Sequence, residues 1–353
     1  MTSFREGVVR DVVATHDGLM RIVVATDSDE VTASVFTDLT GDVAPGDRVV
    51  VNAVGLDLAL GTGGEGFVLW NLSRPPRPDF SPGHIVKLRY TPLQTNVLAA
   101  ESPESDHHEA LRDVLSIEGM PVVACGLHSQ LAAAAAGIKA AAPGARVAYV
   151  MSDGAGLPLV WSDLVRALKD AGLVDVTCTY GHAFGGDLEA VNVFSALAAA
   201  RKVAAADTAI VAMGPGVVGT GTALGFTAME QGMVLDATHA LEGVPIACLR
   251  ISFRDERPRH RGVSHHSLTA LTVGARARAT VAVPDLGDHN PDIVRSLERI
   301  AQRHDLVEAD GRPGIALMEQ RDIRPRSMGR PYEQNPEFFL AAAAAGAVAA
   351  SHV

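Results

Sequence analysis

The feature of this sequence that most limits its fold is an alternation of short apolar runs with alanine-rich stretches from about residue 120 onwards. This alternation is typical of a parallel sheet covered by helices on both faces. The predicted strands are 120–124, 146–151, 174–179, 208–213, 245–252, 279–283 and 314–319. The predicted helices are 128–142, 158–171, 188–204, 220–241, 264–274 and 291–304. The sequence therefore predicts a doubly wound, mostly parallel α/β domain.

The first part of the chain has a different pattern. Short β-rich runs are separated by turn residues such as Asp17-Gly18, with no helical period between them, which predicts a small barrel or sandwich. The glycine-rich stretch 61–64 is interpreted as a hairpin tip, and the proline-rich stretch 74–78 as a linker. We therefore expect a small all-β domain over residues 1–78 and the α/β domain over 79–353, ending in an alanine-rich helix.

Charge and cysteine content narrow the function classes. The chain has 353 residues and a formal net charge of −11, which argues against a general nucleic-acid or anionic-membrane surface. No apolar run reaches the roughly 18 residues that span a bilayer. The three cysteines form no CxxC pair, which is typical of reduced core thiols in a cytoplasmic protein. Whether the chain forms a homo-oligomer is left open.

The loops expected at one edge of the sheet are unusual. In such sheets ligands bind beyond the carboxyl ends of the strands. The loops that follow the first five predicted strands are all rich in glycine, histidine or charge: 125–129, 152–156, 180–187, 214–222 and 253–266. Connections at the other edge, such as 141–144 and 242–244, hold ordinary turn residues. The sequence therefore predicts a site at the carboxyl edge.

The fourth of these loops is the candidate for anion binding. Gly214, Gly216 and Gly219 precede Thr220, which we expect to begin the helix 220–241. Glycines expose backbone N–H groups, and the following helix directs its positive end at a bound phosphate. No lysine follows, and the spacing is not that of GxGxxG in register. A plain tight turn remains an alternative, and a dinucleotide fold is the least favoured one.

The fifth loop concentrates positive charge in an acidic chain. Arg254 and Arg257, with Arg259 and Arg261, fall within eight residues. Arginine binds carboxylates and phosphates through two parallel hydrogen bonds, so this loop is expected to hold an anionic substrate against the glycine loop. A solvated basic loop that pairs with acidic neighbours is the alternative.

The same loop carries candidate metal ligands and proton carriers. His260 and His266 with Asp255 suit a divalent metal ion. His265, His260 and Asp153 are the candidates for moving protons. Adjacent helical residues project about 100° apart, so His265 and His266 are not expected to share one ion. A purely structural role for these side chains stays open.

Other polar residues near the predicted edge receive weaker interpretations. Asp187 precedes the predicted helix 188–204 and is interpreted as its N-cap. His128 and His182 join a site only if the fold gathers them. No GxSxG elbow occurs, so a Ser-His-Asp hydrolase is not supported.

Two motifs, GPGVVGTGTALGF and FRDERPRHRGVSHHSLTAL, resemble those of an uncharacterised, largely actinobacterial family of unknown function. The resemblance covers nearly the whole chain and implies a bacterial cytoplasmic origin and a shared fold, but no activity. Two functions follow from the residues themselves. One is an enzyme that acts on a phosphorylated or other anionic small molecule, with a divalent metal as the candidate cofactor. The alternative is a non-catalytic small-molecule-binding or regulatory protein that uses the same crevice.

Overall fold

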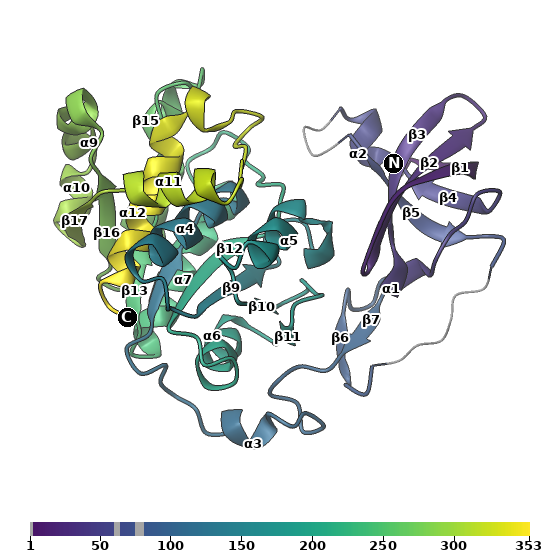
Figure 1. The fold of residues 1–353 in the computed structure, drawn as a ribbon, viewed down its shortest axis with the longest axis horizontal. Helices are drawn as coiled ribbons and strands as arrows, with labels where there is room; N and C mark the ends of the chain where they lie inside the picture. The colour runs from purple at the N-terminus through teal and green to yellow at the C-terminus, as the bar shows by residue number, and fades with distance from the viewer. Residues whose placement is uncertain (1–2, 60–63, 75–80) are drawn as a thin grey trace. The chain divides into compact units, whose positions relative to one another are not determined.

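The structure is a computed structural model that describes residues 3–59, 64–74 and 81–353. The chain forms two compact units, Met1–Ser81 with Leu88–Asn96, and Pro82–Lys87 with Val97–Val353. Figure 1 shows the elements of both. Most of the predicted hairpin tip 61–64 and of the predicted linker 74–78 lies outside the described residues.

The N-terminal unit is a closed barrel with the strand order β1-β2-β3-β5-β4. β3 and β5 pair in parallel, and the other neighbours pair antiparallel. Alternate valine, isoleucine and alanine side chains fill the interior. A small all-β N-terminal domain is therefore confirmed. Its strands are β1 Phe4–His16, β2 Leu19–Thr26, β3 Glu30–Phe36, β4 Arg48–Asn52 and β5 Gly66–Asn71, with the short helices α1 Thr37–Thr40 and α2 Val54–Asp57.

The larger unit contains an eight-stranded sheet with the order β11-β10-β9-β12-β8-β13-β16-β17. All neighbours pair in parallel, which confirms the predicted α/β class. The strands are β8 Pro121–Ala124, β9 Val147–Ser152, β10 Val176–Thr179, β11 Leu188–Glu189, β12 Thr208–Met213, β13 Val244–Ala247, β16 Thr280–Pro284 and β17 Asp305–Ala309. Three short elements precede the sheet: β6 Ile85–Lys87, β7 Thr95–Val97 and α3 His108–Leu111.

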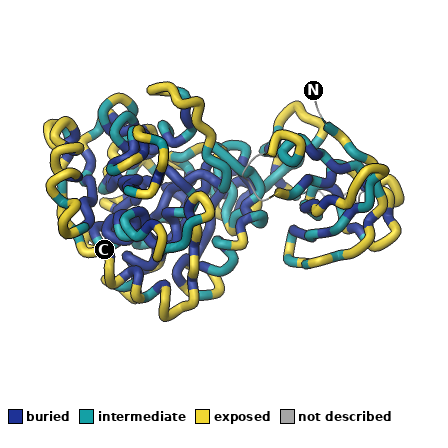
Figure 2. Tube along the Cα trace, turned by 90° about the horizontal axis from the view of Figure 1, so that it is seen from above, coloured by how far each residue is buried: buried dark blue, intermediate teal, exposed yellow. Residues whose placement is uncertain are grey.

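Helices cover both faces of this sheet, and each face has its own apolar core. The helices of the first face are α4 Leu131–Ala141, α5 Asp163–Asp170, α11 Arg312–Gln320 and α12 Pro336–Ala350. The helices of the second face are α6 Val193–Lys202, α7 Glu230–Ala240, α8 His265–Thr269, α9 Asn290–Ser296 and α10 Glu298–Ala301. Figure 2 shows the buried residues gathered in the interior of the unit. No described helix is long and apolar enough to cross a membrane.

Small residues allow α4, α11 and α12 to approach one another closely. A Cβ added at Gly137 of α4 would lie 2.1 Å from the carbonyl oxygen of Ala343 in α12. One added at Gly314 of α11 would lie 2.8 Å from the backbone nitrogen of Gly137. The alanine-rich composition of the predicted C-terminal helix therefore serves a backbone-to-backbone contact that larger side chains would prevent.

Three predictions about the C-terminal half of the sheet are wrong. The predicted strand 314–319 is helix α11, because its apolar residues pack on α4 and α12 at helical spacing. The last strand is instead β17, a short strand at the sheet edge in which no residue is buried. The predicted helix 291–304 and the loop after it did not include this strand. The predicted strand 245–252 leaves the sheet after Ala247, and its end, β14 Ile251–Ser252, pairs antiparallel with β15 Gly262–Val263.

The prediction of Asp187 as a helix cap is also wrong. Leu188–Glu189 is the edge strand β11, and the helix begins only at Val193, where Asn192 is the cap. The Asp187 carboxylate instead accepts hydrogen bonds from the backbone N–H and the hydroxyl of Thr177, at 2.8 and 2.9 Å. It therefore ties the turn before β11 to β10.

Candidate functional site

The glycine loop (residues 214–226) and the arginine-histidine loop (residues 253–266) lie against each other at the carboxyl edge of the sheet. The first follows β12, and the second follows β13 and β14. A Cβ added at Gly219 would lie 3.6 Å from Nε2 of His266, and one added at Gly221 would lie 3.6 Å from Nη2 of Arg259. The two loops that carry the candidate site residues thus share one rim of the sheet.

Local structure brings three histidines of the second loop together. The β14–β15 pairing folds the chain back, and Pro258–His260 forms a 3-10 turn just before β15. Ser264 is the N-cap of α8 and accepts the backbone N–H of His266 at 3.2 Å. His265 and His266 therefore occupy the first turn of the helix, close to His260.

These three side chains form the histidine cluster, His260, His265 and His266. One ring nitrogen from each lies within 4.8 Å of those of the other two. The rings of His265 and His266 have centroids only 4.5 Å apart, although adjacent helical positions diverge, and both contact the ring of His260. Nε2 of His265 is buried and has no hydrogen-bond partner among the described residues. One ring nitrogen of the cluster is therefore available to a ligand.

The surroundings keep the histidine rings neutral. Burial, with a contribution from the Arg250 guanidinium, lowers the pKa of both His260 and His266 to about 3. Burial, with Arg259 as the next cause, also lowers the pKa of His265. Neutral imidazole keeps a lone pair on one nitrogen, which is the form that binds metal ions.

Hydrogen bonds indicate which nitrogens are occupied. Nδ1 of His260 lies 2.7 Å from Oγ of Ser264, so a proton on Nδ1 leaves the Nε2 lone pair free. Nδ1 of His266 lies 3.3 Å from Nη1 of Arg250. A guanidinium only donates, so this Nδ1 accepts, and the neutral ring carries its proton on Nε2.

Asp255 is held by arginines and does not belong to the histidine cluster. Its carboxylate accepts two hydrogen bonds from the Arg257 side chain, at 2.8 and 2.9 Å, and pairs with Arg250 at 3.3 Å. The hydrogen bond from Arg257 is the largest cause that lowers the pKa of Asp255 far below its ordinary range. Arg257 is therefore engaged as well, whereas the sequence suggested a role for it in anion binding.

The glycine loop is built differently from the prediction. Gly219 and Phe226 form an antiparallel bridge, and the N–H of Thr220 donates to the carbonyl of Gly225 at 2.8 Å. Helix α7 begins at Glu230, so the predicted helix start at Thr220 is wrong. The loop closes on itself as a small hairpin, because its threonine hydroxyls and glycines satisfy one another. A 3-10 turn, Thr227–Met229, separates it from α7.

At two positions of this loop the backbone requires glycine. A Cβ added at Gly214 would lie 2.1 Å from the carbonyl oxygen of Gly156, and Gly216 has a φ of +105°. Further along, the Phe226 ring stacks on His266, with centroids 4.0 Å apart and an interplanar angle of 5°. Phe226 thus shields one face of the histidine cluster, a role that no sequence signal indicated.

The arginine-histidine loop keeps unpaired cations at its surface. The side chains of Arg254, Arg259 and Arg261 are exposed and make no hydrogen bond or ion pair with any described residue. Arg259 lies beside Gly221 of the glycine loop. Positive charge without an internal partner therefore borders the cluster.

A second polar group at the same edge was missed by the sequence. The Ser152 hydroxyl, at the end of β9, lies 2.7 and 2.8 Å from the two carboxylate oxygens of Glu230. Burial raises the pKa of Glu230 to about 7. Asp153, a predicted catalytic residue, accepts the backbone N–H of His182 at 2.9 Å. Glu230 lay inside a predicted helix, where nothing distinguished it from a surface carboxylate.

His128 and His182 are not part of the histidine cluster. Nε2 of His128 lies 2.7 Å from the Ser162 hydroxyl, and Nδ1 lies 3.1 Å from the Tyr149 hydroxyl. Burial lowers the pKa of His128 to about 4. Both ring nitrogens of His128 are therefore used in internal contacts.

Comparison with known proteins gives one match. A family model described as "Protein of unknown function (DUF3866)" matches residues 32–346. No curated protein and no solved structure matches the chain. The matched range contains the glycine loop, the arginine-histidine loop and all eight strands of the sheet.

Proposed function

The chain belongs to this family of proteins of unknown function, and from the geometry of its carboxyl edge we propose that it is a metal-dependent enzyme. In this proposal a divalent metal ion binds to the histidine cluster, and the substrate is a phosphorylated or other anionic small molecule. In the same proposal the enzyme works in the bacterial cytoplasm, where the three buried free cysteines stay reduced.

The observation that carries the proposal is the convergence of three imidazoles around one buried, unpartnered nitrogen. A buried polar atom without a partner costs about 1–3 kcal/mol, and a ligand at Nε2 of His265 removes that cost. Four tetrahedral ligands at about 2.1 Å lie about 3.4 Å from one another. The three nitrogens, now within 4.8 Å of one another, reach that spacing when each pair moves closer by at most about 1.4 Å.

The surrounding side chains prepare the cluster for this role. The Ser264 hydroxyl orients His260 through Nδ1, as the outer partners of metal-bound histidines commonly do. Arg250 must release Nδ1 of His266 for that ring to bind through Nε2, and Asp255 can keep the freed guanidinium paired. Three protein ligands leave one position open, where a bound divalent ion polarises a substrate oxygen or activates water.

The unpaired arginines support an anionic substrate. Arg259 lies beside Gly221 in the hairpin of the glycine loop, and its charge contributes to the lowered pKa of His265. Arg254 lies on the same loop as the cluster. Guanidinium groups bind the oxygens of phosphates and carboxylates in pairs. An anion held here would have its charged end beside the open metal position.

One observation favours the alternative, binding without chemistry. The Thr220 amide is used inside the glycine loop, and Arg257 is held by Asp255, so the anion has fewer donors than the sequence suggested. A regulatory protein that senses a metal ion or an anion needs no groups beyond those that bind it. Measuring turnover, and not binding, therefore distinguishes the enzyme from the regulatory protein.

The decisive experiment is metal binding by the full chain after chelation. We expect one Zn²⁺ or Co²⁺ per chain, with at least a 100-fold loss of affinity in His265→Ala and in His260→Ala. His239→Ala, an exposed histidine of α7, is the matched control and should bind as the wild type does. Equal affinity in the wild type and both cluster variants would refute the site.

A second measurement decides between enzyme and binder. Release of inorganic phosphate from a panel of phosphomonoesters is followed with and without the metal ion that binds. Metal-dependent turnover that disappears in His265→Ala supports the enzyme. Tight metal binding with no turnover on any ester, in the wild type and in all variants, supports the regulatory protein.

A further inference from the structure

A cavity of about 330 Å³ lies at the same carboxyl edge, beyond the histidine cluster. It is lined by residues of the arginine-histidine loop and of α9 with the turn before it: Phe253, Arg261, Gly262, His289, Asp292, Ile293 and Ser296. Its volume is at the lower end of the range for small-molecule sites, about 300–1,000 Å³. Arg261 directly follows His260, a member of the cluster, so the cavity and the cluster share the arginine-histidine loop.

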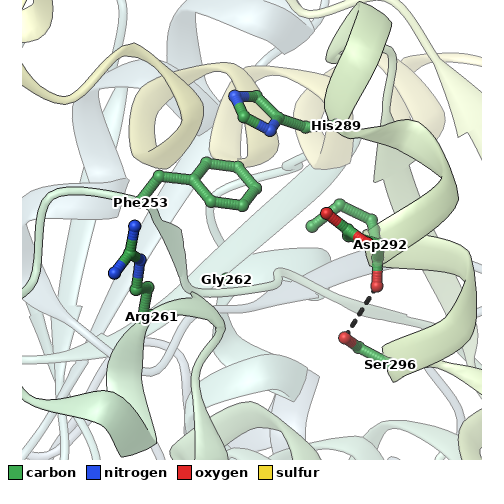
Figure 3. A pocket seen from close by; sticks show the side chains of 7 residues that line it. Phe253, Arg261, Gly262, His289, Asp292 and Ser296 are labelled. Atoms are coloured by element: carbon green, nitrogen blue, oxygen red, sulfur yellow. Dashed lines mark hydrogen bonds between the residues drawn. The ribbon is translucent and has the colours of Figure 1, made fainter.

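One wall of the cavity is aromatic. The rings of Phe253 and His289 stack with centroids 3.9 Å apart and an interplanar angle of 19°. Figure 3 shows both rings at the cavity, and the buried Ile293 adds apolar surface. Such a wall favours a flat ring in the ligand, which stacks on the aromatic face.

The two ends of the cavity carry opposite charges. Arg261 is exposed and has no hydrogen-bond or ion-pair partner among the described residues, so its guanidinium is free to bind an anion. Asp292 and Ser296 lie on the opposite side in Figure 3. The pair of Asp292 with Arg295, at 3.3 Å, joins two exposed side chains and leaves the carboxylate accessible to a donor.

Gly262 keeps the floor of the cavity open. Its φ is +74°, and a Cβ added there would meet no atom within 4 Å. The position therefore combines a left-handed backbone with empty space towards the ligand.

From this arrangement we infer that the cavity binds a nucleoside monophosphate as the substrate of the proposed enzyme. The inference rests on the proposed function for its catalytic meaning, but the cavity can be tested by itself. A nucleotide presents a flat ring for Phe253 and His289, a phosphate for Arg261, and ring amino groups for Asp292. An aromatic amino acid fits less well, because its carboxylate and ammonium are on one carbon. In the cavity, Arg261 and Asp292 lie on opposite sides.

Calorimetric titration of the full chain in EDTA tests the inference without any metal. The probes are adenosine 5′-monophosphate, adenosine, inorganic phosphate and L-phenylalanine. We expect adenosine 5′-monophosphate to bind at least tenfold more tightly than each of the other three. Arg261→Gln should weaken its binding at least tenfold and leave adenosine binding unchanged, since only the phosphate contacts that side chain.

Arg299→Gln is the matched control, because Arg299 is an exposed arginine of α10 that pairs with no described residue and does not line the cavity. It should bind adenosine 5′-monophosphate within twofold of the wild type. His289→Ala should weaken the binding of both adenosine and adenosine 5′-monophosphate. Because Arg261 is exposed, the melting temperature of Arg261→Gln should match that of the wild type.

Three results would overturn the inference: no saturable binding of adenosine 5′-monophosphate, equal binding by the wild type and Arg261→Gln, or tighter binding of L-phenylalanine. Failure of the proposed function looks different. In that case the metal titration without nucleotide shows no dependence on the histidine cluster, whereas nucleotide binding in EDTA still depends on Arg261.

Discussion

The two edges of the eight-stranded sheet use their polar residues in opposite ways. At the amino edge, carboxylates are satisfied by the backbone and by lysine. Asp175 accepts the backbone N–H of Val147 at 2.7 Å and pairs with Lys139 at 2.8 Å. Asp207 accepts the backbone N–H of Arg146 at 2.8 Å. These groups fix the starts of neighbouring strands and leave little capacity for a ligand.

The carboxyl edge keeps groups that the protein itself does not satisfy. Nε2 of His265 is buried without a partner, and Arg259 and Arg261 are unpaired among the described residues. Glu230 has its pKa raised towards neutrality by burial. The difference teaches that one edge of a parallel sheet can satisfy its polar groups within the fold while the other leaves polar groups without an internal partner.

The largest expected effect comes from crowding the carboxyl edge. In Gly214→Ala the new Cβ would lie 2.1 Å from the carbonyl oxygen of Gly156, so the backbone must move. We expect a loss of about 4 kcal/mol in the free energy of unfolding. Gly144→Ala, in an amino-edge turn with nothing within 4 Å, should change it by less than about 1 kcal/mol. Urea unfolding measures the free energy of unfolding of both variants. Equal losses would contradict the tight packing of the Gly214 loop against the Gly156 loop.

The next effect concerns a buried charge. In Asp255→Asn, the buried Arg250 guanidinium and Arg257 lose their carboxylate, which should cost about 3 kcal/mol of unfolding free energy. At the amino edge, Asp305→Asn breaks an exposed, solvent-screened pair with Arg278 and should cost much less than Asp255→Asn does. Chemical denaturation compares the two variants. A cost for Asp255→Asn as small as that for Asp305→Asn would show that solvent reaches Arg250.

The smallest effect depends on pH. Burial raises the pKa of Glu230 from 4.5 to about 7, so the folded state holds a proton that the unfolded state releases. The wild type therefore loses stability as the pH rises from about 4.5 to 7, by about 2 kcal/mol after allowance for partial exposure. Glu230→Gln should abolish this loss, so its melting temperature relative to the wild type should rise between pH 5 and pH 8.

Asp305 provides the opposite sign at the other edge. The hydrogen bond from Arg278 is the largest cause that lowers the pKa of Asp305, so its contribution is present at neutral pH and lost in acid. The stability deficit of Asp305→Asn should therefore shrink as the pH falls below about 4.

For Glu230, a difference in melting temperature between Glu230→Gln and the wild type that does not change with pH would contradict the prediction. It would mean that Glu230 is ionised in the folded protein.

Much of the fold was predictable because it depends on local patterns. The strand 208–213 was predicted at the bounds of β12, and four other central strands were found to within a few residues, because buried parallel strands are continuous apolar runs. β17 was missed because it is a short edge strand with no buried residue, so its sequence lacks the continuous apolar run of a central strand. The apolar run of α11 was interpreted as a strand because a short apolar run does not by itself distinguish a buried helix from a buried strand, and its partner α4 is distant in sequence.

For the candidate site, the sequence indicated that the two loops share one edge of the sheet but not which contacts form within them. Arg257 and Asp255 lie two residues apart, and nothing in that spacing shows that they bind each other. The sequence separated His265 from His266 by helix geometry, but His260 meets both rings because the β14–β15 pairing folds the loop back. Phe226 comes from another loop altogether.

The sequence by itself determined the class of the fold, the division into a β-rich start and an α/β remainder, and the edge at which reactive residues gather. Hydrophobic periodicity and the direction of parallel strands are properties of the chain, and they suffice for that. Only the tertiary structure decided which charges are already paired and which ring nitrogen is left without a partner. Those outcomes depend on distances of a few ångströms between segments far apart in sequence, and no local pattern encodes them.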